Sequence, residues 1–477
     1  MNLLSELQNL LPVIIMAVGG LITLMSGAFW KKSITANYYI SILTVLAALA
    51  KYFTMLDKDV LLMGETVRIS NATVIFSIIA LIAVLLSMTA AKNYIVKQNI
   101  NFTEFYSLIL FSATGMLVML TANDLLIVFV GLELMSLCFY VLAGFMRKKI
   151  KSNESSLKYF LLGSFMTGFL LFGMALIYGV TGSTNFQKIF SDPYFFRQPV
   201  YVIGTLLLTI GFLFKIGIFP FHLWIPDVYE GAPTTITGLM STAGKIAAVG
   251  TIVPILMNGQ LTQFKIIFAV LSVITMLLGN VTALSQSNLK RLLAFSSISS
   301  AGYIFVAVTA LNEYTVKGIA FYLLAYTFMQ IGAFIVVSLI ERPGAGNDDS
   351  SSLIFLDDYK GLAKSNPILA TVLSIFLLSL AGMPPLAGFW GKYYLFYAAI
   401  KANYIWLSVI AILMSVISLY YYLKVIVYMW FQEPEKEIGA IEVSSSYSIA
   451  LTVGCILTFL LGIYPQLFFT IFKTTFK

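Results

Sequence analysis

The chain alternates long apolar stretches with short polar links from one end to the other. A helix that crosses a bilayer needs about 20 mostly apolar residues, and this length divides the sequence into about fourteen helices. Their predicted ranges are Leu10–Phe29, Asn37–Met55, Thr73–Ala91, Phe105–Thr121, Leu125–Phe145, Leu157–Thr181, Tyr201–Tyr229, Thr234–Met257, Phe264–Leu284, Leu292–Leu311, Val316–Ile340, Pro367–Ala399, Ile405–Phe431 and Ser448–Ile471. We therefore predict an all-α polytopic membrane protein.

Composition supports this prediction. Of the 477 residues, 59% are hydrophobic and 10% are charged, whereas soluble proteins carry about 25% charged residues. The formal net charge of +8 comes from lysines and arginines in the short links, so it indicates membrane topology and not affinity for nucleic acid. The lipid bilayer is an expected partner, and nucleic acid is not.

The chain offers few groups that hold cofactors. Cys138 and Cys455 lie in separate apolar stretches, without the spacing of a metal site or a disulfide framework. His222 is the single histidine, and no glycine-rich phosphate loop follows a strand pattern. We therefore expect no cofactor and no metal in this chain.

Basic residues are distributed unevenly between the links. Counted from the first link, the odd-numbered links carry more of them, including the cluster Arg147–Lys151. Because lysine and arginine concentrate on the cytoplasmic side, we predict that these links are cytoplasmic and that both chain ends lie outside. The longest link, Arg342–Asn366, is rich in Gly, Ser and Asp, which predicts a mobile surface loop with Asp357 and Asp358 in solvent.

Two predicted helices contain proline and glycine at membrane depth. One includes Gly211–Asp227, GFLFKIGIFPFHLWIPD, and the other includes Gly382–Lys392, GMPPLAGFWGK. Proline removes a backbone donor and clashes with the preceding turn, and the freed carbonyls then need protein or water partners. Because each segment carries a lysine, the pair predicts two broken helices of a repeated transporter architecture. Two ordinary proline kinks are the alternative.

Four ionisable residues lie inside the apolar stretches: Glu133, Lys215, Lys245 and Lys392. A charge near the bilayer centre costs about 2.5–3.5 kcal/mol, so membrane proteins that retain such charges usually use them to move ions. Lys215 lies about one turn before Pro220, where the carbonyls of a half-helix end favour a charge and burial opposes it. Such a lysine is suited to take up and release a proton. A structural ion pair for Glu133, and lysines that snorkel to the interface, are the alternatives.

Three more residues join the candidates. Lys158, near the start of the next helix, is either the ion-pair partner of Glu133 or an interfacial lysine. His222, beside the first break, is either a proton relay or a structural histidine. Ser241 lies one turn from Lys245, where its hydroxyl is expected to help hold water.

Two features leave alternatives open. Lys392 lies about two turns into the second half-helix if the break is at Pro384–Pro385, or beside the positive helix end if the break is at the glycines. A polar seam either lines a hydrated path or holds helices together by hydrogen bonds. The seam consists of Ser296, Ser297, Ser299, Ser300 and Tyr303.

Several motifs resemble the antiporter-like subunits of respiratory complex I. The segment Phe219–Pro233, FPFHLWIPDVYEGAP, closely resembles the signature of that family's seventh helix, and Asn288–Ser297 and Gly382–Phe389 fit the same family. The resemblance covers nearly the whole chain, including the three leading helices. The ending of the first motif is similar to one branch of the family. Lys392 replaces the glutamate that is general in a second branch, and the stop at Lys477 leaves no room for the lateral helix of a third.

This resemblance implies two inverted five-helix repeats within fourteen helices, and a proton path along a hydrated midplane. It places the three leading helices at 1–103, the repeats at 104–258 and 259–431, and the last helix at 432–477. The family's helix-five glutamate, helix-six lysine and relay histidine fall on Glu133, Lys158 and His222. Its lysines of helices seven, eight and twelve fall on Lys215, Lys245 and Lys392.

The implied function is proton translocation by a non-redox subunit of an NADH:quinone oxidoreductase in the bacterial inner membrane. NADH, flavin, iron–sulfur clusters and quinone are expected in other subunits, and neighbouring antiporter-like and small membrane subunits are expected partners. One rival is a subunit of a multi-subunit cation/proton antiporter, which the ending Val228–Pro233 disfavours. Another is a scaffold with structural ion pairs. The sequence does not identify the electron donor.

Overall fold

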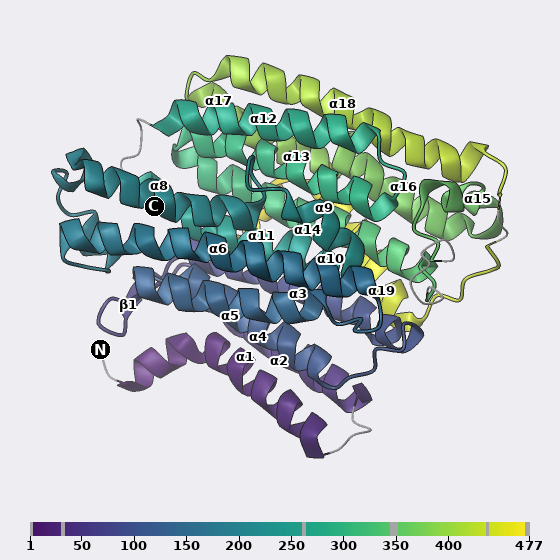
Figure 1. The fold of residues 1–477 in the computed structure, drawn as a ribbon, viewed down its shortest axis with the longest axis horizontal. Helices are drawn as coiled ribbons and strands as arrows, with labels where there is room; N and C mark the ends of the chain where they lie inside the picture. The colour runs from purple at the N-terminus through teal and green to yellow at the C-terminus, as the bar shows by residue number, and fades with distance from the viewer. Residues whose placement is uncertain (1–2, 30–33, 260–263, 344–351, 436–437, 473–477) are drawn as a thin grey trace.

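The computed structural model describes residues 3–29, 34–259, 264–343, 352–435 and 438–472, and most of them lie in helices that run side by side (Figure 1). Among these residues, 13 helices are long and apolar enough to cross a membrane. A further crossing is made by two shorter helices in tandem, α16 (Pro367–Ala381) and α17 (Ala387–Lys401). The predicted all-α membrane fold with about fourteen crossings is therefore confirmed.

Most crossings are single helices. These are α1 (Leu3–Phe29), α2 (Ile34–Phe53), α3 (Asn71–Lys97), α4 (Glu104–Thr121), α5 (Leu125–Ala143), α6 (Ile150–Thr181), α8 (Pro199–Ile216), α12 (Lys265–Leu284), α13 (Leu289–Ala310), α14 (Glu313–Ile340), α18 (Ile405–Phe431) and α19 (Ser445–Ile463). One crossing changes type along its length, from α10 (Thr234–Leu239) through a π-helical turn, η2 (Met240–Gly244), to α11 (Lys245–Asn258). The shorter elements are α7 (Phe186–Ile189), η1 (Phe195–Arg197), α9 (Trp224–Gly231), η5 (Leu356–Tyr359), α15 (Leu362–Ser365), α20 (Gln466–Ile471) and the antiparallel strands β1 (Val60–Leu62) and β2 (Val67–Ile69).

Several predicted helix boundaries differ from the structure, among them the start of the first helix, which is Leu3 and not Leu10. Two of the differences have clear physical reasons. The helix predicted from Leu157 begins at Ile150, because its first turns carry charged residues that lower the local hydropathy without stopping the helix. The helix predicted to continue to Ile471 ends at Ile463, and α20 follows as a separate element. Pro465 lies between them and has no backbone N–H with which to continue the helix.

Both predicted helix breaks are present. The helix α8 ends at Ile216, and Gly217 caps it with a φ of +88° before α9 begins seven residues later at Trp224. The helix α16 ends in the same way, with Gly382 at a φ of +90°. Positive φ of this kind is readily available to glycine and strained for other residues. The sequence therefore ends both half-helices by the same device.

The crossings form a central group and a peripheral group. Every residue in the most apolar part of α14 is buried, and α13 and the α10–α11 crossing are nearly as deeply enclosed. Figure 1 shows α14 in the middle of the bundle, with α1 and α18 at opposite edges. The outer helices expose large apolar side chains such as Leu43, Phe165 and Val416, which suits a surface that faces lipid.

The odd-numbered links lie together at one end of the bundle. We call it the basic end, and it includes the described parts of the links 98–103, 144–149, 285–288, 341–366 and 432–444. Contacts between segments far apart in the sequence define it: Asn93 in α3 bonds Ser446 in α19 (3.3 Å), and Asn288 forms a β-bridge with Phe355. The opposite end carries the β1–β2 hairpin. Which end faces the cytoplasm stays a prediction, as does the division into four sequence segments.

The longest link differs from its prediction where it is described. Asp358 is buried and accepts a hydrogen bond from the backbone N–H of Phe355 (3.0 Å), so the predicted exposure of Asp358 is wrong. Asp357 is exposed, as predicted, and pairs with Lys360. Residues 344–351 of this link lie outside the described part of the chain.

Candidate functional site

Lys215 occupies the last turn of α8, directly before the break. Its buried ammonium donates to the Tyr140 hydroxyl on α5 (3.1 Å) and lies over the rings of Tyr140 and Tyr159, 5.1 and 5.3 Å from the ring centres. Aromatic faces attract cations, and the unsatisfied carbonyls of a helix end do the same. The predicted position at the carboxyl end of a half-helix is confirmed.

His222 lies in the segment between α8 and α9. The imidazole is buried, and its Nδ1 bonds no described group. The break around it is held rigidly, because Trp224 donates to the carbonyl of Phe214 (3.0 Å) and stacks on Tyr159 at 4.3 Å. A buried nitrogen without a partner costs free energy, so this position suits a group that exchanges protons with water or a neighbouring residue.

Lys245 is the first residue after the π-helical turn and is 2% exposed. Its ammonium donates to the carbonyl (2.7 Å) and the hydroxyl (2.8 Å) of Ser297 on α13, and lies 5.2 Å from the Tyr326 ring. Ser241 instead donates to the Gly238 carbonyl (2.9 Å). The π-helical turn η2 was not predicted, because the hydropathy is continuous across it. Such π turns are frequent at functional sites.

Lys392 lies inside α17, and its side chain reaches back across the second break. The ammonium donates to the carbonyl of Ala381 (2.9 Å), the last residue of α16, and to the Ser415 hydroxyl on α18 (2.7 Å). The break therefore spans 382–386, and the lysine contacts the negative end of the first half-helix, not the positive end of the second. The Tyr303 ring covers the ammonium at 4.9 Å.

The polar seam of α13 connects two of these lysines. Ser297 contacts Lys245, and Tyr303, six residues later, contacts Lys392. Six residues of an α-helix span about 9 Å. Ser296, in contrast, bonds Tyr422 of α18 and so joins two helices. Hydrogen bonding between helices, one of the two uses left open by the sequence, is therefore present, and a hydrated path along the seam stays a prediction.

Glu133 is partly buried and accepts a hydrogen bond from Thr167 on α6 (2.8 Å). It forms no ion pair within the described residues, and Lys158 is not its partner. Lys158 instead pairs with Asp227 (2.8 Å) and Glu154 (2.6 Å). Of the two alternatives for Lys158, the Glu133 ion pair is therefore wrong, because the carboxylates of Glu154 and Asp227 hold the Lys158 ammonium at the basic end.

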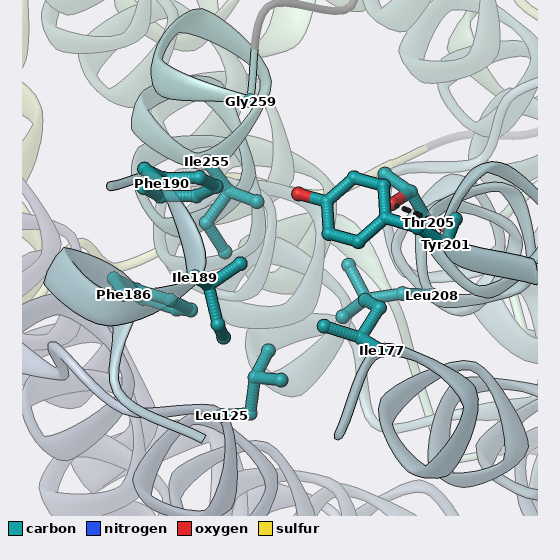
Figure 2. A pocket seen from close by; sticks show the side chains of 10 residues that line it. All are labelled: Leu125, Ile177, Phe186, Ile189, Phe190, Tyr201, Thr205, Leu208, Ile255 and Gly259. Carbon is teal, nitrogen blue, oxygen red and sulfur yellow. Dashed lines mark hydrogen bonds between the residues drawn. The ribbon is translucent and has the colours of Figure 1, made fainter. Parts of the chain in front are cut away.

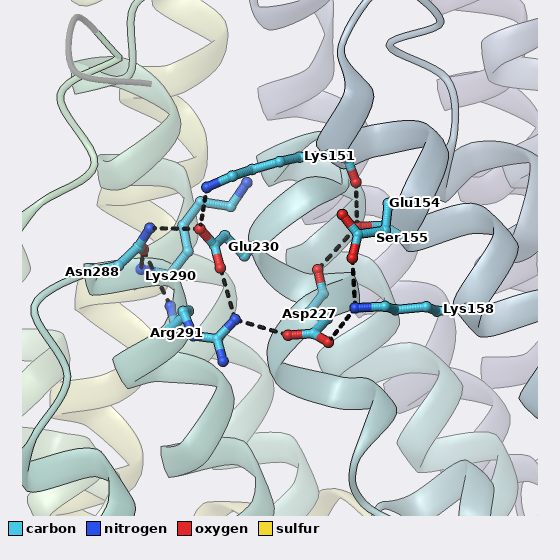
Figure 3. A network of polar contacts seen from close by, with 9 residues as sticks. All are labelled: Lys151, Glu154, Ser155, Lys158, Asp227, Glu230, Asn288, Lys290 and Arg291. Atoms are coloured by element: carbon cyan, nitrogen blue, oxygen red, sulfur yellow. Dashed lines mark hydrogen bonds and ion pairs between the residues drawn. The ribbon is translucent and has the colours of Figure 1, made fainter. Parts of the chain in front are cut away.

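The ion pairs at the basic end connect α6, α9 and α13 (Figure 3). Arg291 of α13 donates to Asp227 (2.9 Å) and to Glu230 (2.8 Å), and Lys151 of α6 also donates to Glu230 (2.8 Å). Both carboxylates belong to α9. The network thus holds the short helix that follows the first break between its two neighbours, and sequence reasoning did not find it.

Three pockets of the described structure are lined by residues other than Lys215, Lys245 and Lys392. One is lined mostly by apolar side chains of α5, α6, α7, α8 and α11, together with Tyr201 and Thr205 (Figure 2). Its volume of about 10 Å³ corresponds to roughly one water molecule. A larger hollow of about 600 Å³ lies beside the hairpin, near Arg68 and Glu313. The described residues contain no group of three or more His, Cys, Asp or Glu that would hold a metal ion.

Fold and site define a class: polytopic membrane subunits of the antiporter-like type, with buried lysines at broken helices. The family described as NADH:quinone oxidoreductase/Mrp antiporter matches residues 122–418. NADH-quinone oxidoreductase subunit N of Trichlorobacter lovleyi is 42% identical over 97% of this chain and 95% of its own length. The chain therefore belongs to the NADH-quinone oxidoreductase subunit N family, the branch that the ending Asp227–Pro233 resembles.

Two further relatives agree with this assignment. F(420)H(2) dehydrogenase subunit N of Methanosarcina mazei is 35% identical over 98% of this chain and 97% of its own length. A chain of respiratory complex I from Thermus thermophilus, solved with bound aureothin, has a TM-score of 0.81 and 31% identity over 96% of this chain and 98% of that chain. The likeness extends over the entire helical bundle.

Proposed function

We propose that this chain moves protons along a path that contains Lys215, Lys245 and Lys392. The supporting observation is that hydroxyls, carbonyls and aromatic rings hold each buried amine, with no carboxylate in ion-pair contact within the described residues. A hydroxyl accepts a hydrogen bond from an ammonium, and it can also donate one to the lone pair of a neutral amine. The same contacts therefore serve both protonation states.

We propose the order Lys215, His222, Lys245 and Lys392, in which contacts of α13 support the last step. A proton on Lys215 passes through His222 and water to Lys245, and from there along the Ser297–Tyr303 face of α13 to Lys392. Glu133 and Tyr140 lie seven residues apart on one face of α5, about 10 Å along the helix axis. The Glu133 carboxylate thus acts on Lys215 from two turns away, and movement of charge near Glu133 changes how firmly Lys215 holds its proton.

The energy for transport comes from electron transfer elsewhere in the complex. We propose that NADH or F(420)H(2), flavin, iron–sulfur clusters and quinone bind to other subunits, and that this chain is a non-redox part of a proton translocase. Relatives named for both electron donors resemble the chain over nearly its full length. The subunits that copurify with this chain identify the donor.

The test compares two lysines of α17. Lys392 is buried beside the break, whereas Lys401 ends the same helix and is exposed. In membrane vesicles containing the complex, Lys392→Ala is expected to assemble and to lower the protons moved per electron, and Lys401→Ala is expected to have no effect. A normal proton-to-electron ratio in Lys392→Ala, Lys245→Ala and Lys215→Ala would refute the proposal. Assembly without pumping would exclude a purely structural role.

A further inference from the structure

A buried carboxylate lies at the basic end, outside the path described above. Glu341 follows the last residue of α14 and is 3% exposed. Its Oε2 accepts hydrogen bonds from the Tyr94 hydroxyl on α3 (3.0 Å) and from the Thr234 hydroxyl at the start of α10 (2.5 Å). It forms no ion pair within the described residues. Burying a carboxylate that only neutral hydroxyls contact costs free energy. A protein that needed only a link between helices would not need a charged group at this position.

The surroundings of Glu341 connect it to the surface. Arg342, the next residue, is exposed, so the carboxylate lies directly beneath the end of the bundle. Lys97 donates to the carbonyl of Leu339 (2.6 Å), which keeps a positive charge nearby. The Tyr359 hydroxyl lies within reach of the Glu341 charge and is buried without a described partner. The group is therefore enclosed by polar atoms although it is shielded from bulk solvent.

A row of buried hydroxyls leads from Glu341 to Lys245. Thr234, Thr237 and Ser241 precede Lys245 at intervals of three or four residues, which places all four on one face of the crossing. The Thr234 hydroxyl donates to Glu341. The hydroxyls of Thr237 and Ser241 donate to backbone carbonyls of their own crossing or of nearby α9. The oxygen lone pairs of all three hydroxyls therefore stay available as acceptors. The row spans about 16 Å, and α3 and α14 pack against it.

We propose that Glu341 is the group through which protons from the basic end reach Lys245. This inference rests on the proposed function. Hydronium from solvent at the basic end protonates the Glu341 carboxylate and leaves water. The resulting carboxylic acid passes its proton through water and the hydroxyls of Thr234 and Ser241 to the neutral amine of Lys245. Lys245 becomes an ammonium and Glu341 returns to a carboxylate. No further reactant takes part.

The experiment measures protons moved per electron in vesicles that contain the whole complex. Glu341→Gln keeps the size and hydrogen-bonding capacity of the side chain but does not carry a proton, and Glu341→Asp keeps the acid. Glu442→Gln is the matched control, because Glu442 is exposed at the same end. We expect Glu341→Gln to lower the ratio to that of Lys245→Ala, Glu341→Asp to restore it, and Glu442→Gln to leave it unchanged.

Each outcome separates the inference from the proposed function. If Glu341→Gln pumps normally while Lys245→Ala does not, Glu341 only links α3, α10 and α14, and the inference is overturned. If Lys245→Ala alone pumps normally, the inference is overturned because its proton acceptor is not needed. If Lys215→Ala, Lys245→Ala and Lys392→Ala all pump normally, the proposed function fails as well.

A second pair of variants applies if Glu341→Gln does not assemble. Ser241 and Thr242 are both buried, and both donate to the Gly238 carbonyl, but only Ser241 lies on the row. Ser241→Val is expected to lower pumping and Thr242→Val is not. Equal pumping in the two variants overturns the inference.

Discussion

Replacing Arg291 by Gln tests whether the ion-pair network holds α9 in place. The change removes two charge-assisted hydrogen bonds, of 2.9 Å to Asp227 and 2.8 Å to Glu230. The side chains of Arg291 and Asp227 are 30% and 36% exposed, so solvent screens that contact, and we assign it about 0.5 kcal/mol. Glu230 is 13% exposed, and its contact contributes about 1.5 kcal/mol. A total of about 2 kcal/mol corresponds to a roughly 30-fold larger open population of α9.

Hydrogen–deuterium exchange of the purified complex measures this opening, because exchange of the α9 amides follows the population of its locally open state. Peptides that cover 224–231 are expected to exchange roughly 30-fold faster in Arg291→Gln. Arg68→Gln is the matched control, since Arg68 also pairs with a carboxylate, Asp59, but at the hairpin end. Unchanged exchange of α9 in Arg291→Gln, or an equal rise in Arg68→Gln, would show that the network does not hold α9.

Three other perturbations test the packing, the path and the hairpin. In Gly388→Ala the added methyl would lie 1.8 Å from the Ser379 carbonyl oxygen, so α17 no longer packs on α16. A native gel is then expected to show less assembled complex. Gly168→Ala, whose added methyl meets open space, should assemble normally. Ser415→Ala removes one of two acceptors of Lys392 and should lower the proton-to-electron ratio less than Lys392→Ala does; an equal loss would mean that the Ala381 carbonyl contributes nothing. The Arg68 guanidinium, bonded to Asp59, lowers the pKa of that carboxyl. The contact therefore stabilises the β1–β2 hairpin fully at pH values above the unfolded-state pKa of about 3.9. This stabilisation is lost as pH falls through the lower pKa of Asp59 in the folded state. Amide protection of the hairpin is then expected to stay constant at neutral pH and to fall only below about pH 4, and an earlier fall would contradict this reading.

Features that depend on nearby residues were predicted correctly from the sequence. Apolar length gave the crossings, and proline with glycine gave both breaks, because each is a property of a short segment. Lys215 was placed correctly at a half-helix end for the same reason. The π turn before Lys245 was missed, since no residue there interrupts the hydropathy.

Features that depend on distant partners were not predictable in this way. Lys158 and Asp227 are 69 residues apart, and Glu341 and Thr234 are 107 apart. Hydropathy and spacing give no information about such contacts. The sequence therefore suggested Glu133 as the partner of Lys158 from closeness along the chain, and treated the link after α14 as wholly solvent-exposed.

The two breaks explain how deep amines are tolerated without carboxylate partners. Each break frees carbonyls at the end of a half-helix. Lys392 bonds the final carbonyl of α16, whereas Lys215, in the last turn of α8, lies at the negative end of that half-helix and bonds the Tyr140 hydroxyl. The glycine that ends α16 also makes room, because a methyl group at Gly382 would lie 3.0 Å from the Lys392 side chain. An amine held by fixed dipoles loses a proton without leaving a partner carboxylate unpaired. In a buried ion pair, removing one partner leaves an uncompensated charge and destabilises the protein by about 3–5 kcal/mol. Under the proposed function, neutral contacts therefore keep the free-energy difference between the charged and the neutral lysine smaller than a tight ion pair at the same positions would.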